Sequence, residues 1–361
     1  MSASNPIPAA RPWAEIDLGA LVANARTVLS VSGSRLLPMV KANGYGTGAV
    51  AVARALEAVD PWGFGVVTVE EGRALREAGI TRPVIVFGPV SAEGIAACLR
   101  DRLRPVLGDL GAVRHWLGLG AHPFHVEVDT GMARLGFRWT DGSALQELAP
   151  LLAEAVGWEG IFTHFHSADS DPASIAVQWD RLHGVVAALG RRPPMVHAAN
   201  SAAALLGTTY GGDLVRPGIF LYGGAAGSAH APRTVVRLRA PVVATRRLAA
   251  GDSVSYGATW RAPRATTIAT VAAGYADGVP RRLGGAGRVE IGGVAYPIVG
   301  RVTMDFLMAD VGDAAVTMGD VATLFGGCVS LEAQAAAAGT ISYELLTSIG
   351  ARVERRYGEA G

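Results

Sequence analysis

Short apolar segments alternate with amphipathic or alanine-rich segments over the first 240 residues, and this alternation constrains the fold more than any other feature. Between the apolar segments, helices are expected over 49–58, 69–78, 92–100, 143–155 and 174–189. Eight apolar segments read as buried strands: 36–41, 62–67, 83–87, 103–107, 124–128, 160–164, 194–198 and 214–220. Eight β-then-α repeats predict a (β/α)8 TIM-type barrel, an α/β fold. A doubly wound sheet usually carries a Gly-rich nucleotide turn, and no GxGxxG follows the first strand.

The pattern of the sequence changes after about Pro241, from alternating strands and helices to mostly β-forming segments. Segments 242–245, 267–271, 288–291 and 321–325 are rich in β-formers and are separated by Gly-Asp, Gly-Gly and Ala-Pro turns. Segments 331–338 and 342–356 return to helical patterns. We therefore expect a disordered leader over 1–12, a barrel over 13–240 and a mainly-β C-terminal domain over 241–361.

Composition excludes several classes of partner. The 32 Lys and Arg residues nearly balance 31 Asp and Glu residues, and no basic run stands out, so neither nucleic acid nor a membrane surface is an expected partner. No apolar segment reaches membrane-spanning length, and the first dozen residues do not resemble a signal peptide. Cys98 and Cys328 lie far apart, which indicates a reducing compartment and no disulfide framework. A cytoplasmic protein is expected.

Lys41 ends the apolar run that forms the first expected strand, and a glycine-rich turn follows it directly. The carboxyl ends of barrel strands are where such folds keep their chemistry. A lysine desolvated there can lose its proton and form a Schiff base with a carbonyl cofactor. From this segment alone, a solvated lysine at a strand end remains the alternative.

Other polar groups lie near the carboxyl ends of later strands. His164 ends strand six, Ser201 follows strand seven, and Arg216 lies in strand eight. Phosphate is often bound by the loops after strands seven and eight of such barrels, where Ser201 offers a hydroxyl and Gly218 and Ile219 offer backbone N–H groups. A phosphate-bearing cofactor facing a Schiff-base lysine indicates pyridoxal 5′-phosphate (PLP).

Seven motifs, taken together, resemble the alanine racemase family in order and spacing, and the resemblance runs from about Trp13 to Arg352. The motifs occupy residues 40–46, 129–136, 197–201, 215–218, 254–257, 274–278 and 300–305. The resemblance implies a homodimer of a PLP-binding barrel and a β-domain. It also implies that each active site is completed by the partner's β-domain, which explains why a β-domain follows the barrel.

The resemblance implies two bases. Lys41 would hold PLP and move the α-proton on one face of an amino-acid substrate, and Tyr256 from the other subunit would do so on the opposite face. Two bases are needed because a planar carbon re-protonated by the base that deprotonated it largely returns the starting enantiomer. A tyrosine ordinarily ionises only near pH ~10, so its surroundings must favour the ionised form. Without the motifs, a packed aromatic would be the simpler interpretation of Tyr256.

Arg216 carries the most mechanistic information. The resemblance implies that it lies behind His164 and faces the pyridine nitrogen of PLP, where many PLP enzymes place a carboxylate. Because an arginine only donates hydrogen bonds, it should leave that nitrogen unprotonated and disfavour transamination. Taken alone, an Arg before Pro-Gly would also fit a surface position.

The remaining roles follow from matching motif positions. The substrate carboxylate would be held by Arg134 and the Met304 N–H, with Tyr275 narrowing the entrance and Glu127 and Asp305 in support. No metal is expected. Contacts to the cofactor are expected from Lys41, Tyr45, His164, Ser201, Arg216, Gly218, Ile219 and Tyr222.

Three positions depart from the family pattern. Many members have a carbamylated lysine where this chain has Glu127, which encodes the same negative charge directly on a shorter side chain. Ala351 replaces a phosphate-side tyrosine, and Thr303 stands where a cysteine is common. The first two departures leave strict alanine specificity open.

The sequence thus predicts a PLP-dependent racemase that interconverts L- and D-alanine and supplies D-alanine for peptidoglycan. A racemase of broader range, acting on serine or other small amino acids, is one alternative. Another is a PLP barrel decarboxylase or aldolase, which would normally place an acid at the pyridine nitrogen. A single-domain PLP-binding protein would leave the β-domain without a purpose, and a non-catalytic binding protein would make the pairing of Lys41 with Tyr256 a coincidence.

Overall fold

The structure, a computed structural model, describes residues 11–358, which form two compact units. One unit comprises Leu21–Arg233, and the other comprises the residues before it together with those from Thr234 onward. Of the expected leader, only positions 11 and 12 fall within the described residues. Among the described residues, no helix has the length and apolarity needed to cross a membrane.

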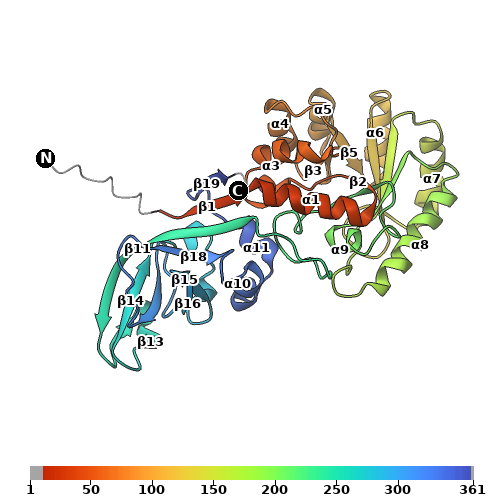
Figure 1. Ribbon diagram of the computed structural model, residues 1–361. Helices are drawn as coiled ribbons and strands as arrows, with labels where there is room; N and C mark the ends of the chain where they lie inside the picture. Colours follow the sequence, from red (N-terminus) through yellow and green to blue (C-terminus); the bar gives the residue numbers. More distant parts are fainter. Residues whose placement is uncertain (1–10, 359–361) are drawn as a thin grey trace. The chain divides into compact units, whose positions relative to one another are not determined.

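The first unit is built on eight parallel strands, which confirms the barrel prediction (Figure 1). Six of them form a continuous ladder in the order β3-β4-β5-β6-β8-β9, and β10 pairs with β2. A bridge from Met39 to Gly65 joins the β2 segment to β3, and the Asp213 N–H donates to the Val196 carbonyl across β9 and β10. The strands are β2 (Arg35–Leu36), β3 (Phe64–Val66), β4 (Val84–Val86), β5 (Arg104–Leu107), β6 (Phe124–Asp129), β8 (Trp158–Phe162), β9 (Met195–His197) and β10 (Leu214–Val215).

The helices of the barrel begin where polar side chains cap their first turns. Thr68 and Glu71 form a capping box at α4, and Ser91, Asp109 and Asp141 each accept a backbone N–H at the start of α5, α6 and α7. The short strand β7 (Phe137–Arg138) adds to β6. The helices are α1 (Leu18–Ser32), α2 (Lys41–Tyr45), α3 (Ala49–Leu56), α4 (Val69–Glu77), α5 (Ala92–Arg100), α6 (Leu110–Gly118), α7 (Gly142–Ala153), α8 (Ala173–Ala188) and α9 (Ser201–Ala204).

Three expected strands end two or more residues earlier than the sequence indicated. The strand expected over 36–41 stops at Leu36, and the one expected over 214–220 stops at Val215. Pro38 and Pro217 follow closely, and neither has an N–H to extend a ladder. The strand expected over 160–164 ends at Phe162, so His164 lies just beyond it. Lys41, His164 and Arg216 therefore lie beyond the ends of their strands rather than within them.

The second unit is a mainly-β domain with a sheet in the order β16-β15-β18-β11-β1-β19, in which β14 pairs with β11 and β17 (Figure 1). Its helices are α10 (Leu331–Ala338) and α11 (Ser342–Thr347). Its strands are β1 (Trp13–Asp17), β11 (Val236–Leu248), β12 (Ser253–Val254), β13 (Trp260–Arg261), β14 (Thr266–Val271), β15 (Arg288–Ile291), β16 (Val294–Pro297), β17 (Leu307–Gly312), β18 (Val321–Phe325) and β19 (Glu354–Gly358).

Two features of this unit differ from the expectation. Residues 13–17, expected in the barrel, form β1, which pairs with β11 and β19 inside the β-sheet. Alternate residues of β1 are buried, as in a strand with one covered face, and this short pattern was not recognised as a strand. The helix expected over 342–356 ends at Thr347, and the chain returns to the sheet as β19.

Candidate active site

Lys41 begins a turn of unusual backbone geometry. Residues 42–45 all adopt the left-handed conformation, with φ between 51° and 62°, and Gly46 continues it at 82°. Left-handed residues other than glycine are strained, and consecutive ones persist only where the surroundings hold them. Here the Asn43 side chain accepts the Ala49 N–H at 3.1 Å, and the Val40 carbonyl accepts the Gly44 N–H at 2.8 Å. The backbone next to Lys41 is therefore rigidly placed.

Lys41 lies in surroundings that favour its neutral amine. Burial, followed by the positive charges of Arg134 and Arg216, lowers the pKa of Lys41, and the charge of Glu71 opposes them. Glu71 is held close by because its carboxylate accepts the Ala42 N–H at 2.7 Å. A lysine of this kind is suited to act as a nucleophile and as a base.

Lys41 is also the only lysine among the 361 residues; every other basic side chain of the Lys and Arg set is an arginine. This count was available from the sequence and would have singled out Lys41 without any motif. No other lysine can compete for a carbonyl cofactor.

A cradle of polar hydrogens lies beyond strands β9 and β10. The Ser201 hydroxyl accepts the Gly218 N–H at 2.9 Å, and the buried Ile219 N–H has no acceptor among residues 11–358. A Cβ on Gly218 would lie 2.1 Å from the Tyr45 hydroxyl, so only glycine allows that approach. Hydroxyl and backbone donors that converge in this way match the needs of a phosphate group.

Tyr222 supports this cradle from behind. Its ring stacks on Tyr45 with centroids 4.5 Å apart, and its hydroxyl donates to the Met39 carbonyl at 2.8 Å. Burial raises the pKa of Tyr222 well above its ordinary value, so the group stays a neutral donor. In this structure the Tyr222 hydroxyl is engaged by the backbone, and its evident effect is to fix Tyr45.

Arg216 is buried at the centre of the site. Its Nη1 donates to His197 Nδ1 at 2.8 Å, and its Nη2 donates to the carbonyls of Thr163 and Ala198 at 2.9 and 3.0 Å. Within the described residues its Nε–H has no acceptor, which leaves one directed donor for a ligand atom. Burial lowers the pKa of Arg216 to about 9, so the guanidinium remains charged at neutral pH.

His164 lies against the same guanidinium. Its Nδ1 is 3.3 Å from Arg216 Nη2, and burial and then the charge of Arg216 lower its pKa well below the ordinary value. Because Arg216 only donates, His164 Nδ1 must accept, and the proton of the neutral ring sits on Nε2. His164 Nε2 has no partner in the described part of the chain, so it can donate to an incoming group.

Glu127 is buried in β6 beside the site. Burial raises its pKa, and the positive charges of Arg134 and Arg216 oppose that rise. Across residues 11–358 no direct hydrogen bond joins Glu127 to Arg134. Glu127 instead lines a cavity of about 280 Å³ together with Phe87 and Leu135. A water there could bridge the shorter glutamate to the arginine.

The loop that carries Arg134 is shaped by Asp129. The Asp129 carboxylate accepts the N–H groups of Gly131 and Ala133 at 3.0 and 2.9 Å, and Ala133 takes a left-handed φ of 56°. The loop presents Arg134 as an exposed side chain after β6. Arg134 is thus available to a small anionic ligand.

In the β-unit, three turns bring the other expected site residues together. The Ser255 hydroxyl donates to the Arg301 carbonyl at 2.7 Å, and the Tyr275 N–H donates to the Thr303 carbonyl at 3.0 Å. Tyr256 and Met304, next to these contacts in sequence, are 72% and 53% exposed. The Met304 N–H has no acceptor among the described residues. These groups present an exposed face that is both apolar and able to donate.

Asp305 belongs to an ion-pair network that the sequence did not reveal. Its carboxylate pairs with Arg352 at 2.8 Å, and Arg352 also pairs with the buried Asp277 at 2.6 Å. This network ties the segment after Met304 to the segment after Tyr275, and so stabilises both turns. The contact between Asp305 and Arg352 joins positions far apart in the chain, which a local pattern does not report.

The residues present fit the cofactor expected from the sequence. One unit brings together a single desolvated lysine, a group of donors suited to phosphate, and a buried guanidinium whose Nε–H has no acceptor among the described residues. These would supply PLP with a Schiff-base partner, a phosphate site and a partner for its pyridine nitrogen. Fold and site therefore define a (β/α)8-barrel enzyme of the pyridoxal-phosphate class.

The comparisons with known proteins name the family. The description "Alanine racemase, N-terminal domain" matches residues 16–226, and "Alanine racemase, C-terminal domain" matches residues 235–357. The chain belongs to the alanine racemase family, whose members use PLP to racemise alanine.

Individual relatives are similar to this chain over nearly its whole length. An alanine racemase of Symbiobacterium thermophilum is 42% identical, with 96% of this chain and 97% of that protein covered. One of Deinococcus radiodurans is 39% identical, with 96% and 99% covered. The solved structure from Bartonella henselae, which has covalently bound pyridoxal phosphate, has a TM-score of 0.90 at 32% identity and covers 97% of this chain and 100% of that one.

Proposed function

We propose that this chain interconverts L- and D-alanine by two-base proton transfer, with Lys41 on one face of the substrate and Tyr256 of the partner subunit on the other. The observation that carries this proposal is Arg216, whose Nη1 and Nη2 both donate to buried protein acceptors and whose Nε–H, without an acceptor among the described residues, is left for the pyridine nitrogen. A decarboxylase of the same architecture would favour an acid there. The expected racemase, in contrast, needs only a donor.

The residues of the site have separate roles in the proposed reaction. When bound, PLP withdraws electrons from the α-carbon of the substrate and so acidifies its proton. Arg216, a permanent donor, keeps the pyridine nitrogen unprotonated, which limits this acidification but disfavours proton delivery to the cofactor carbon that transamination needs. Arg134 orients the substrate carboxylate together with the Met304 N–H of the β-domain that the partner subunit supplies. Lys41, with its lowered pKa, holds or returns the proton at Nζ.

Tyr256 is proposed as the second base. Its hydroxyl belongs to a highly exposed side chain, and the free Nε2–H of His164 is a suitable donor to it when the partner's β-domain covers the site. A donor that itself stays neutral stabilises a tyrosinate without competing for its proton. His164 thereby couples Tyr256 to Arg216.

A homodimer with shared active sites follows from this arrangement. Exposed apolar side chains gather on the turns around Tyr256, namely Tyr275, Met304 and Phe306, with 45%, 53% and 42% of their surface exposed. Contiguous exposed apolar surface of this kind indicates a covered face in the working protein. We assign the partner subunit as the cover.

In the cell, the reaction is proposed to supply D-alanine for peptidoglycan in the cytoplasm. Cys98 and Cys328 are both free, and Cys328 is exposed. An exposed free thiol suits a reducing compartment. No partner of nucleic acid or membrane is included in the proposal.

A racemisation assay across L-alanine, L-serine and larger L-amino acids tests this function and its range. We expect alanine to be racemised fastest, serine more slowly and branched or aromatic substrates least, because Tyr275 and Met304 narrow the site. Ala351 removes side-chain bulk relative to the tyrosine found in some relatives, so measurable serine turnover is expected. Decarboxylation products without inversion of configuration would contradict the proposal.

Glu127→Gln is expected to weaken catalysis by about 1–3 kcal/mol of transition-state stabilisation, the scale of a charged hydrogen bond. The substitution keeps the shape of Glu127 but removes the charge that orients Arg134. Wild-type activity should not depend on dissolved CO2, because no carbamate has to form. Measured kcat/KM at controlled bicarbonate checks both statements.

Glu127→Lys serves as the matched comparison. The new lysine should restore part of the activity by carbamylation, and that rescue should rise with bicarbonate. Equal rates and equal substrate affinity in Glu127→Gln and wild type would show that Glu127 is not used in orienting Arg134.

A further inference from the structure

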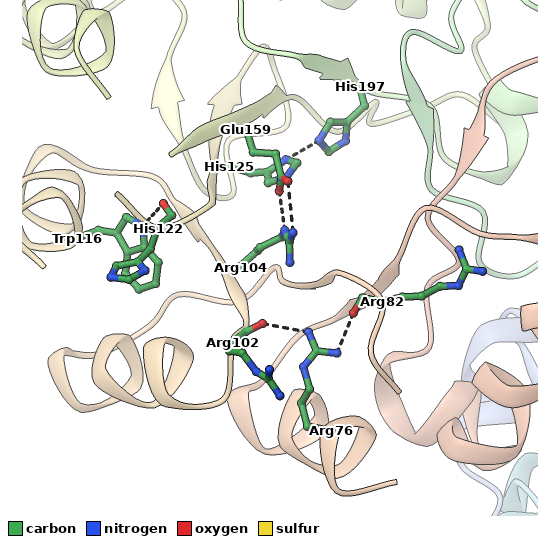
Figure 2. A network of polar contacts seen from close by, with 9 residues as sticks. All are labelled: Arg76, Arg82, Arg102, Arg104, Trp116, His122, His125, Glu159 and His197. Carbon is green, nitrogen blue, oxygen red and sulfur yellow. Dashed lines mark hydrogen bonds and ion pairs between the residues drawn. The ribbon is translucent and has the colours of Figure 1, made fainter. Parts of the chain in front are cut away.

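A column of buried polar side chains runs from Arg216 away from the substrate side of the barrel. His197 Nδ1 accepts from Arg216 at 2.8 Å, and His197 Nε2 lies 3.0 Å from His125 Nδ1. His125 Nε2 in turn lies 3.3 Å from the Glu159 carboxylate. Figure 2 shows His125 between His197 and Glu159, and Arg104 beyond Glu159. Neither the sequence motifs nor the proposed two-base chemistry assigned a role to His125 or Glu159.

The hydrogen bonds in this column can point in only one direction. Arg216 has no acceptor atoms, so His197 must accept at Nδ1 and carry its proton on Nε2. That proton must then be donated to His125 Nδ1, which places the proton of His125 on Nε2. The carboxylate of Glu159, an acceptor only, receives it. One fixed donor at the top and one fixed acceptor at the bottom thus dictate both tautomers.

Both histidines are neutral in this scheme. Burial, followed by the charge of Arg216, lowers the pKa of His197 well below its ordinary value. Burial also lowers the pKa of His125, although Glu159 opposes the shift. Protonating either histidine ring would place two N–H donors opposite each other inside the barrel, with no acceptor between them.

The packing around the column fits the two histidine rings closely. A Cβ on Gly160 would lie 2.2 Å from His125 Nδ1, so this position must lack a side chain for His125 to accept from His197. The Phe162 ring stacks on His197 with centroids 5.0 Å apart and also lies under the Arg216 guanidinium at 4.9 Å. These contacts pack against His125 and His197 in the orientations that the column requires.

The lower end of the column is anchored by charge. Arg104 Nε donates to Glu159 at 2.6 Å, and the guanidinium lies 5.6 Å from the Trp62 ring centroid. Burial would raise the pKa of Glu159, but the hydrogen bonds from His125 and Arg104 outweigh it and the pKa lies below its ordinary value. Glu159 therefore stays an acceptor at neutral pH.

We infer that Glu159 and His125 are positioning residues for Arg216, acting through the tautomer of His197 to aim the free Nε–H at the cofactor nitrogen. The inference rests on the proposed function for its catalytic consequence, but the hydrogen-bond polarity is independent of it. If the column is broken, His197 no longer has to accept at Nδ1. Arg216 then loses the acceptor of its Nη1, while Nη2 keeps the carbonyls of Thr163 and Ala198.

His125→Phe is the most direct variant. It keeps an aromatic ring but removes both ring nitrogens, so that the buried Nε2–H of His197 has no acceptor. We expect kcat to fall about 10-fold or more, with KM changed much less, which is the scale of losing an outer partner of a site residue. Glu159→Gln, a milder change, should lower kcat in the same direction. The matched control is Glu147→Gln, which breaks an exposed pair with Arg114 and should leave kcat unchanged.

Tautomers are read directly by ¹⁵N NMR of histidine-labelled, PLP-loaded full-length protein. In the wild type, His125 and His197 should both carry the proton on Nε2 and stay neutral from about pH 5 to about pH 8. In Glu159→Gln, His125 should lose this single tautomer. A wild-type His197 protonated on Nδ1 would overturn the inference whatever the enzyme's activity, so this readout separates its failure from failure of the proposed function.

A double-mutant cycle with Arg216→Gln tests whether the column acts through Arg216. The inference predicts that His125→Phe has almost no further effect on kcat once Arg216 is replaced. If His125→Phe lowers kcat by the same factor with and without Arg216→Gln, His125 has a purely structural role instead. If His125→Phe does not fold, as judged by circular dichroism, Glu159→Gln enters the same cycle and decides the question.

Discussion

Replacing Lys41 with alanine should abolish racemisation in both directions, a loss of more than about 10⁴-fold. The variant removes the amine that is expected to bind PLP and the base on one face of the substrate at once. Because Lys41 is the only lysine of the chain, no neighbouring lysine can substitute for it. Absorbance of lysine-bound PLP and rates from both enantiomers are the measurements.

Borohydride reduction sharpens this experiment. In the wild type, reduction should fix one PLP on each chain, and the label should map to Lys41. In Lys41→Ala, no lysine remains to be labelled. Racemisation by this variant at the wild-type rate would remove Lys41 from the mechanism.

Local patterns predicted most of the barrel because its strands and helices are each set by short-range periodicity. Val84–Val86 and Arg104–Leu107 are apolar strands that fall inside the expected segments, and α10 has the expected bounds. A strand end followed by a glycine-rich turn predicts Lys41 as a candidate site residue. What the pattern misjudged was the ends of strands, where Pro38 stops a ladder that hydrophobicity alone would extend.

Contacts between distant positions could not be predicted in this way. β1 pairs with β11 and β19 in the β-domain, and both partners lie hundreds of residues further along the chain. Nothing within Trp13–Asp17 identifies them, so the pairing could not be predicted from the local sequence. His125 and Glu159 likewise lie in strands β6 and β8, whose apolar residues predict buried strands but not the partners of these two side chains. Their meaning appears only when the barrel closes and brings them below Arg216.

At Glu127, the residue type can be known from the sequence while the contact that its side chain makes cannot. The sequence predicts a built-in negative charge at Glu127, but it does not determine whether the side chain reaches Arg134. In the structure the pair interacts through charge beside a cavity rather than through a direct bond.

The central claim is that one substrate carbon is served by bases from two different chains. Lys41→Ala and Tyr256→Phe should each be inactive, because each leaves one face of the substrate without a base. In a heterodimer of the two, one site lacks both bases and the other has both.

Mixing the two inactive variants is therefore the most direct measurement. A statistical mixture should recover about a quarter of the wild-type sites, and a purified, differently tagged heterodimer should recover about half of its own. Each variant unfolded and refolded alone is the control and should remain inactive. A verified heterodimer that shows no racemisation would contradict the shared site.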